Sequence, residues 1–130
     1  MNRLTAISAL FALACAGCAT PPAAPPAGGL SDLLERPAER ALYEGMRAYD
    51  DGQYPAAEKS LRRALGEGLA SPRDRANAYK LIAFIACTSE RLGECEAAFM
   101  AARTVYPAFV LSRSEAGHPL WGPVYRRVAP

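Results

Sequence analysis

Two cysteines, Cys87 and Cys95, stand eight residues apart in a stretch that otherwise favours helix. On one continuous helix this spacing corresponds to a rise of ~12 Å, because each residue adds about 1.5 Å. The Cα atoms of a disulfide lie only about 4.4–6.8 Å apart. A bond between the two cysteines therefore requires a break in the helix, and Thr88, Ser89 and Gly93 supply weak helix formers there. We expect a helical hairpin with one cysteine on each side of its bend.

The pairing of these cysteines has two alternatives. Both could stay reduced and serve as small buried side chains, or they could form a thiol-redox site. A redox site has little support, because the sequence has no C-x-x-C motif and no neighbouring His or Lys that would lower a thiol pKa. A disulfide would close a loop of about nine residues and stabilise the domain by ~2.5 kcal/mol.

The beginning of the chain has the pattern of a secretory signal peptide. Arg3 precedes the apolar run LTAISALFALACAGC, which is too short for a membrane-spanning helix. The small residues before Cys18 resemble a bacterial lipobox, where the signal is removed and the new N-terminal cysteine is acylated. We therefore expect residues 1–17 to be a lipoprotein signal peptide and Cys18 to be lipidated. Lipidation of Cys15 and cleavage by the ordinary signal peptidase are the alternatives.

The next segment, ATPPAAPPAGG, contains no large apolar residue and cannot form a core. Pro-rich chains extend by ~3.1 Å per residue, so this segment could hold a domain about 30 Å from a bilayer. We expect residues 18–36 to be a lipidated Pro/Ala-rich tether and residues 37–130 to be a helical domain. Ala19 follows Cys18 where the inner-membrane retention signal has Asp. The expected location is the periplasmic face of the outer membrane of a Gram-negative cell.

Apolar residues beyond residue 37 recur every three or four positions, which predicts helices. Leu42, Met46 and Tyr49 mark the apolar face of the first helix, and Asp74 is expected to cap the third. When the two halves of the helical region are aligned with an offset of 38 residues, small residues align with small ones and large apolar residues with large ones. Gly45 aligns with Ala83, Ala57 with Cys95 and Leu61 with Phe99.

This pattern resembles two tetratricopeptide (TPR) units, although Glu44, Ala48 and Ala86 depart from the usual residues. We expect an all-α fold of antiparallel helical hairpins, with about two TPR-like units and a short C-terminal capping segment. A generic antiparallel helical bundle is the alternative. Two units are fewer than the usual minimum of about three, so a crosslink would matter to so small a domain.

The C-terminal stretch GHPLWGPVYRR holds the only His and the only Trp of the chain. Repeat proteins need an atypical end that covers the last apolar face, which predicts a capping role for Leu120, Trp121, Val124 and Tyr125. Trp, Tyr and Arg are also the residue types that carry binding energy, so His118, Trp121, Tyr125 and Arg126 are candidates for partner docking. His118 alone does not indicate a catalytic base or a metal ligand.

The run LIAFIACTSERLGECEAAFMAA, followed by YPAF and SEAGHPLWGPVYRRV, resembles small TPR-like lipoproteins found with type VI secretion systems, the TssQ-like group. The resemblance covers roughly residues 76–128. It places two cysteines of the group at Cys87 and Cys95, and a C-terminal motif at residues 115–126. It implies an envelope lipoprotein associated with the secretion apparatus.

These features predict a non-enzymatic scaffold that binds a protein partner, with a component of the secretion machine as the best candidate. The membrane is contacted through the N-terminal lipid, and we expect no cofactor, no metal and no nucleic acid. A single His, the lack of a metal-ligand cluster and the lack of a Gly-rich phosphate loop argue against an enzyme. The chain has a net charge of +2, and its basic residues form no evident stripe that would suggest nucleic-acid binding. An envelope assembly or peptidoglycan-associated adaptor unrelated to secretion is the alternative.

Overall fold

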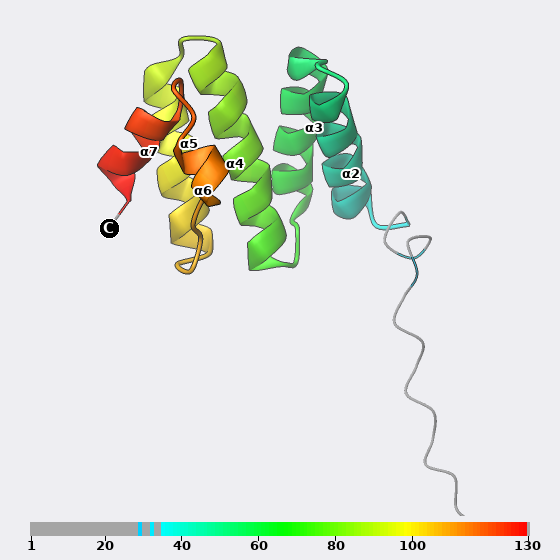
Figure 1. Ribbon diagram of the computed structural model, residues 1–130. Helices are drawn as coiled ribbons and strands as arrows, with labels where there is room; N and C mark the ends of the chain where they lie inside the picture. The colour runs from blue at the N-terminus through cyan, green and yellow to red at the C-terminus, as the bar shows by residue number, and fades with distance from the viewer. Residues whose placement is uncertain (1–28, 30–31, 33–34, 130) are drawn as a thin grey trace, which may run out of the picture.

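A computed structural model describes residues 29, 32 and 35–129 of the chain (Figure 1). Over these residues the ordered elements are helices: α2 (Pro37–Asp50), α3 (Tyr54–Glu67), α4 (Pro72–Thr88), α5 (Leu92–Val105), α6 (Arg113–Ala116) and α7 (Gly122–Val128). Helices α2 and α3 form one antiparallel hairpin and α4 and α5 a second, with α6 and α7 beside the second hairpin. The expected all-α fold of helical hairpins is confirmed.

The predicted signal peptide, Cys15, Cys18 and most of the tether lie outside the described residues. Helix α2 begins at Pro37, where the helical domain was expected to begin, because proline at the first helical position has the right φ and needs no hydrogen-bond acceptor.

Glycine or proline lies in the turns on either side of α3. Gly52, with a φ of 72°, follows α2, and Gly68, with a φ of 87°, ends α3 in the left-handed conformation. The expectation that Asp74 caps α4 was wrong. Ser71 is the N-cap, and its hydroxyl accepts a hydrogen bond at 3.2 Å from the backbone N–H of Asp74, one turn inside the helix. Pro72 fixes this start.

Only part of the apolar face that was expected for α2 packs against the rest of the domain. Its buried residues are Ala38, Ala41, Leu42 and Gly45, whereas Met46 is 38% exposed and Tyr49 is half-buried. The reason is the close approach of α3, since a Cβ added to Gly45 would lie 2.8 Å from Cγ of Leu61. The small residues of α2 allow α3 to pack closely, and the larger side chains lie at the edge of this contact.

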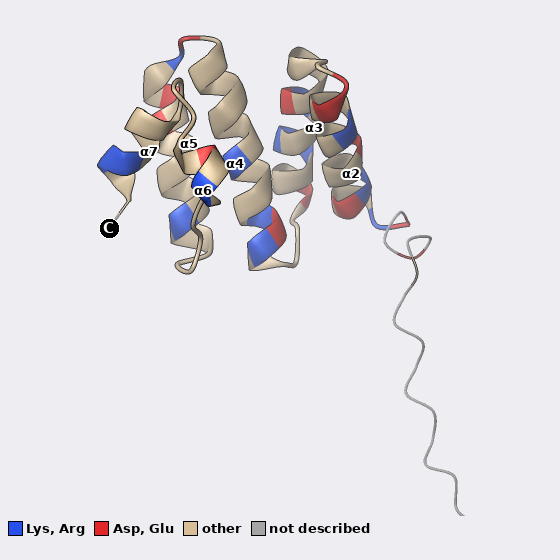
Figure 2. Ribbon diagram, in the orientation of Figure 1, with Lys and Arg blue, Asp and Glu red and all other residues tan. Residues whose placement is uncertain are grey.

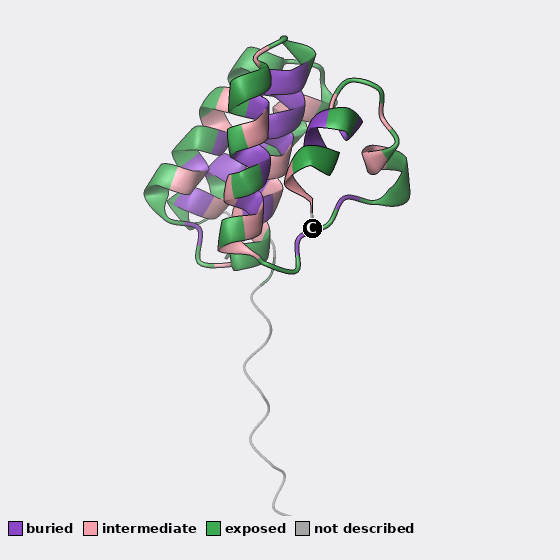
Figure 3. Cartoon of the chain, turned by 90° about the vertical axis from the view of Figure 1, so that its left-hand side faces the viewer, coloured by how far each residue is buried: buried purple, intermediate pink, exposed green. Residues whose placement is uncertain are grey.

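Helix α4 is the most buried element of the described chain. Nine of its residues are buried, including every residue from 81 to 87. Helix α4 packs against α5 within its own hairpin and against α2 and α3 of the first hairpin. Figure 3 shows this burial as a continuous core, with the C-terminal segment lying along one side of it.

The disulfide joins the two helices of the second hairpin at their bend. Helix α4 ends at Thr88 and α5 begins at Leu92, so the helix breaks where the cysteine spacing requires it. The Cα atoms of Cys87 and Cys95 lie 5.2 Å apart, and the structure joins their sulfurs. Both side chains are buried, which suits a structural crosslink with no access for a redox partner.

Two glycines of the first hairpin make a matched test of this packing. Gly45→Ala should lower the free energy of unfolding by about 1–2 kcal/mol, because crowding against Leu61 outweighs the gain in helix propensity. Gly66→Ala should raise it by about 0.5–1 kcal/mol, because the site lies inside α3 and is open. Urea unfolding with the disulfide intact measures both. A Gly45→Ala variant as stable as Gly66→Ala would contradict the close packing.

Candidate functional site

The C-terminal segment contains the residues that sequence reasoning selected, and it lies against the second hairpin (Figures 1 and 3). Ser112 starts α6 with a capping box. Its hydroxyl accepts a hydrogen bond at 3.3 Å from the N–H of Glu115, and its own N–H donates at 2.9 Å to the Glu115 carboxylate. The short helix therefore has a fixed start, which holds the following loop over α4.

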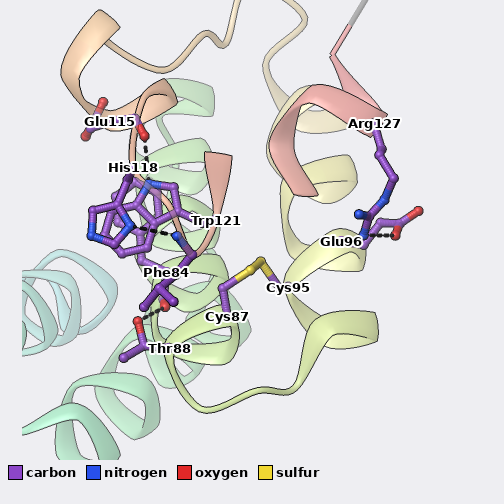
Figure 4. The surroundings of a disulfide bond; sticks show 10 residues. Phe84, Cys87, Thr88, Cys95, Glu96, Glu115, His118, Trp121 and Arg127 are labelled. Atoms are coloured by element: carbon purple, nitrogen blue, oxygen red, sulfur yellow. Dashed lines mark hydrogen bonds and ion pairs between the residues drawn. A yellow bond between two sulfur atoms is a disulfide. The ribbon is translucent and has the colours of Figure 1, made fainter. Parts of the chain in front are cut away.

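Three aromatic rings form a stack at the centre of this segment (Figure 4). The indole of Trp121 lies on the ring of Phe84 from α4, with centroids 4.2 Å apart, and His118 covers its other face at 3.4 Å. The indole N–H of Trp121 donates at 2.8 Å to the backbone carbonyl of Glu115. A half-buried Trp with its polar atom satisfied stabilises the fold through both contact area and the hydrogen bond.

An ion pair holds α6 to α4 beside the stack. Nζ of Lys80 lies 2.7 Å from Oε1 of Glu115 and 5.7 Å from the centroid of the Phe84 ring. Burial acts to raise the pKa of Glu115, but hydrogen bonds from Lys80 and Ser112 outweigh it, so the pKa lies below its usual value. Glu115 therefore stays ionised and keeps its contact with Lys80.

Helix α7 completes the packing on α5. Tyr125 is buried, with its ring 5.3 Å from that of Phe99 and 6.3 Å from that of Phe109. Its hydroxyl accepts a hydrogen bond at 3.2 Å from the N–H of Leu111. Gly122 is needed at the start of α7, because an added Cβ would lie 2.5 Å from the carbonyl oxygen of Ala116.

A similar ion-pair contact recurs further along the chain, with the acid 38 residues later and the arginine 36 residues later. Glu58 of α3 pairs with Arg91, which lies in the bend between α4 and α5, at 2.6 Å between Oε2 and Nη2. The equivalent residue of α5, Glu96, pairs with Arg127 of α7 at 3.2 Å. The Arg91 hydrogen bond is the main reason that the pKa of Glu58 lies below its ordinary value, and Arg62 adds to it. The C-terminal segment thus occupies the place that a third hairpin would take.

The structure places the predicted residues in two roles. Trp121, Val124 and Tyr125 contribute to the hydrophobic core, and His118 covers Trp121. The expectation that Leu120 belongs to the cap was wrong, because Leu120 is 50% exposed. Arg126 is exposed and donates at 3.4 Å to the carbonyl of Ala116. Cys87 lies one turn after Phe84 on α4, so the disulfide and the ring stack brace the same helix (Figure 4). Within residues 35–129 no group of three His, Cys, Asp or Glu could hold a metal ion.

The first hairpin presents large side chains that sequence reasoning did not select as functional. Tyr43 is 46% exposed, and Tyr54 is 39% exposed with its ring 5.5 Å from that of Tyr49. Burial raises the pKa of Tyr49, and the nearby Tyr54, Asp50 and Glu115 add to the rise. One sequence pattern could have identified these exposed residues. The alanines and the glycine on the opposite side of α2 are small enough for α3 to pack closely there, so the larger side chains remain exposed.

Hollows on the described surface are shallow. One, of about 360 Å³, lies between the start of α4 and the loop after α5, lined by polar and apolar side chains that include Arg73, Asn77, Lys80, Tyr106 and Val110. Another, of about 280 Å³, lies between α3 and α5, over Tyr79 and Ile82 of α4.

Comparison of the chain with protein-family models, with curated proteins and with solved structures finds no match. Among the described helices none is long and apolar enough to cross a membrane.

Trp121→Ala separates a capping role from a docking role. Loss of the stack on Phe84 should lower the free energy of unfolding by about 2–3 kcal/mol, because a large buried contact area is removed. Leu120→Ala is the control, since Leu120 is 50% exposed and its truncation should change stability by less than about 0.5 kcal/mol. Thermal and urea unfolding measure both. If Trp121→Ala unfolds like the unmodified protein, the cap assignment is wrong.

Proposed function

We propose that this protein is a lipid-anchored, non-enzymatic scaffold that binds a protein partner as an accessory component of a type VI secretion system. The secretion assignment rests on the resemblance of residues 76–128 to the TssQ-like group. The anchor rests on the lipobox-like sequence before Cys18 and the Pro-rich stretch that follows it. The expected site of action is the periplasmic face of the outer membrane.

The observation that best supports a binding role is the contrast in exposure of the aromatic side chains between the two ends of the hairpin array. At the C-terminal end, the large aromatic residues of the segment pack onto α4 and α5. At the N-terminal end, Tyr43, Met46 and Tyr54 remain well exposed. Tyr and Met are enriched in protein interfaces, and exposed side chains of this kind on a small rigid domain support a protein partner.

Affinity purification tests the proposal in the organism's own envelope. The full-length chain, tagged at its C-terminus and cross-linked in cells, should enrich structural components of the type VI secretion machine at least about tenfold over an untagged strain, a conservative margin for a specific complex. Enrichment of peptidoglycan-binding or assembly proteins without secretion components would instead favour the adaptor alternative and contradict the proposal.

Cysteine variants test the anchor in the same strains. Cys18→Ala should move the protein from the membrane fraction to the soluble fraction, because one acyl-bearing cysteine supplies the membrane attachment. Cys15→Ala is the matched control and should leave the protein in the membrane fraction. The opposite distribution would assign the lipid to Cys15.

A further inference from the structure

The hollow of about 360 Å³ between the start of α4 and the loop after α5 lies at the end of the array where the chain enters α2. Antiparallel pairing places the start of α2, the start of α4 and the loop after α5 at this same end (Figure 1). We call the hollow the entry groove, and the residues used below are Arg73, Asn77, Lys80, Tyr106 and Val110. Residues that immediately precede α2 therefore emerge near this groove.

Apolar and aromatic side chains cross the entry groove from α2 to the loop after α5. On the side of α2, Met46 is 38% exposed, and its Sδ lies 3.7 Å from Nδ2 of Asn77. On the side of the loop, Val110 is 71% exposed, and Tyr106 and Phe109 supply two aromatic rings. This surface suits a ligand whose apolar groups repeat along an extended chain.

The charges around the entry groove balance one another. Arg73 and Asp74 supply one charge of each sign at the start of α4, where Figure 2 shows basic and acidic positions next to each other. Nζ of Lys80 lies 2.7 Å from Oε1 of Glu115. A charged ligand would find no excess of the opposite sign among these described residues, so the groove favours an uncharged one.

The groove also offers hydrogen-bond donors. Within the described chain, Nδ2 of Asn77 has only the Met46 sulfur as a partner, which is a weak acceptor, and the Tyr106 hydroxyl makes no hydrogen bond. A proline-rich segment matches such donors, because its carbonyls have no internal hydrogen bonds and its prolines have no N–H of their own. A helix would match them less well, since its carbonyls are already bonded.

The chain itself contains a segment of this chemistry shortly before α2. Residues 19–28, ATPPAAPPAG, have four prolines, no charge and no large side chain, and they lie outside the described residues. Pro22 and Pro25 would lie on one edge of a polyproline II helix, which has about three residues per turn. Segments with prolines at this spacing bind aromatic-lined grooves, because they are already extended before they bind.

The chain between this segment and α2 is long enough for docking. Residues 29–36 connect the segment to Pro37, and a connection of this length spans up to about 26 Å when extended. Packed helices lie about 8–10 Å apart, so the path from α2 over α4 to the loop is about 20 Å. As polyproline II, residues 19–28 would be about 31 Å long, which is enough to cross the whole groove.

We propose that residues 19–28 bind in the entry groove of their own domain. The prolines would pack on Tyr106 and Val110, and the Asn77 amide would donate to a carbonyl of the segment. Docking holds this end of the domain close to Cys18, the proposed lipid site, and release extends the tether by about 30 Å. The inference rests on the anchor in the proposed function and does not depend on the secretion assignment.

Photo-cross-linking in the native envelope tests this docking. The full-length chain would carry p-benzoylphenylalanine in place of Val110, and mass spectrometry would identify the cross-linked segment. The expected product joins position 110 to residues 19–28 of the same chain, so it migrates as a single chain on a denaturing gel. The same probe in place of Leu92, which is 51% exposed at the opposite end of the second hairpin, should not give this product.

A matched pair of double variants tests the role of the prolines. Pro22→Gly/Pro25→Gly should lower the yield of the product about fivefold, because ring contacts are lost and the more flexible chain loses more conformational entropy on docking. Ala24→Gly/Ala27→Gly adds the same number of glycines to the segment and keeps its four prolines, so the yield should change less than about twofold.

Two kinds of result would overturn the proposal. The first is the absence of a product with residues 19–28, or a product whose yield is the same in both double variants. The second is a product that joins position 110 only to a second copy of the chain or only to another protein, which would assign the groove to that partner.

Failure of the docking and failure of the proposed function can be told apart. Secretion components recovered by affinity purification without the intrachain product would leave the proposed function standing and remove the docking. The intrachain product without any secretion component would keep the docking and remove the secretion assignment.

Discussion

Burial of α4 is the constraint on which the rest of the structure depends. Every residue from 81 to 87 is buried, which a helix in a two-layer packing with one free face could not achieve. Three neighbours are therefore required: the first hairpin, α5 and the C-terminal segment. The Phe84 ring shows the need most directly, because Trp121 and Phe99 contact it from two separate elements.

This requirement explains how an array of two hairpins reaches stability. The C-terminal segment takes the place of a third hairpin and repeats its ion pair, Glu96 with Arg127 in place of Glu58 with Arg91. The disulfide fixes α5 to α4 at the end of the core, where the helix breaks. At the other end, α2 offers a charged face rather than an apolar one, so the array can stop there without exposing a core.

The sequence predicted the elements well and their packed faces less well. Cysteine spacing and weak helix formers located the bend of the second hairpin, because the covalent geometry of a disulfide excludes a straight helix. Periodicity placed Met46 and Tyr49 in the core of α2, but close approach at Gly45 decided the packed face. Periodicity indicates which residues lie on the same face of a helix, but it does not indicate how closely the neighbouring helix packs against that face.

The same limit applies to the candidate site. Trp121 and Tyr125 satisfied the composition rules for both a cap and a docking motif, and only their contacts with Phe84 and Phe99 show that they pack onto the hairpin.

Hydrogen exchange followed by mass spectrometry, with the disulfide intact, tests the central place of α4 most directly. Amides that open only with global unfolding exchange most slowly. The structure predicts that the slowest amides of the domain lie in residues 78–87 of α4, with α2 faster. Exchange in α2 as slow as in α4, or slower, would contradict the account.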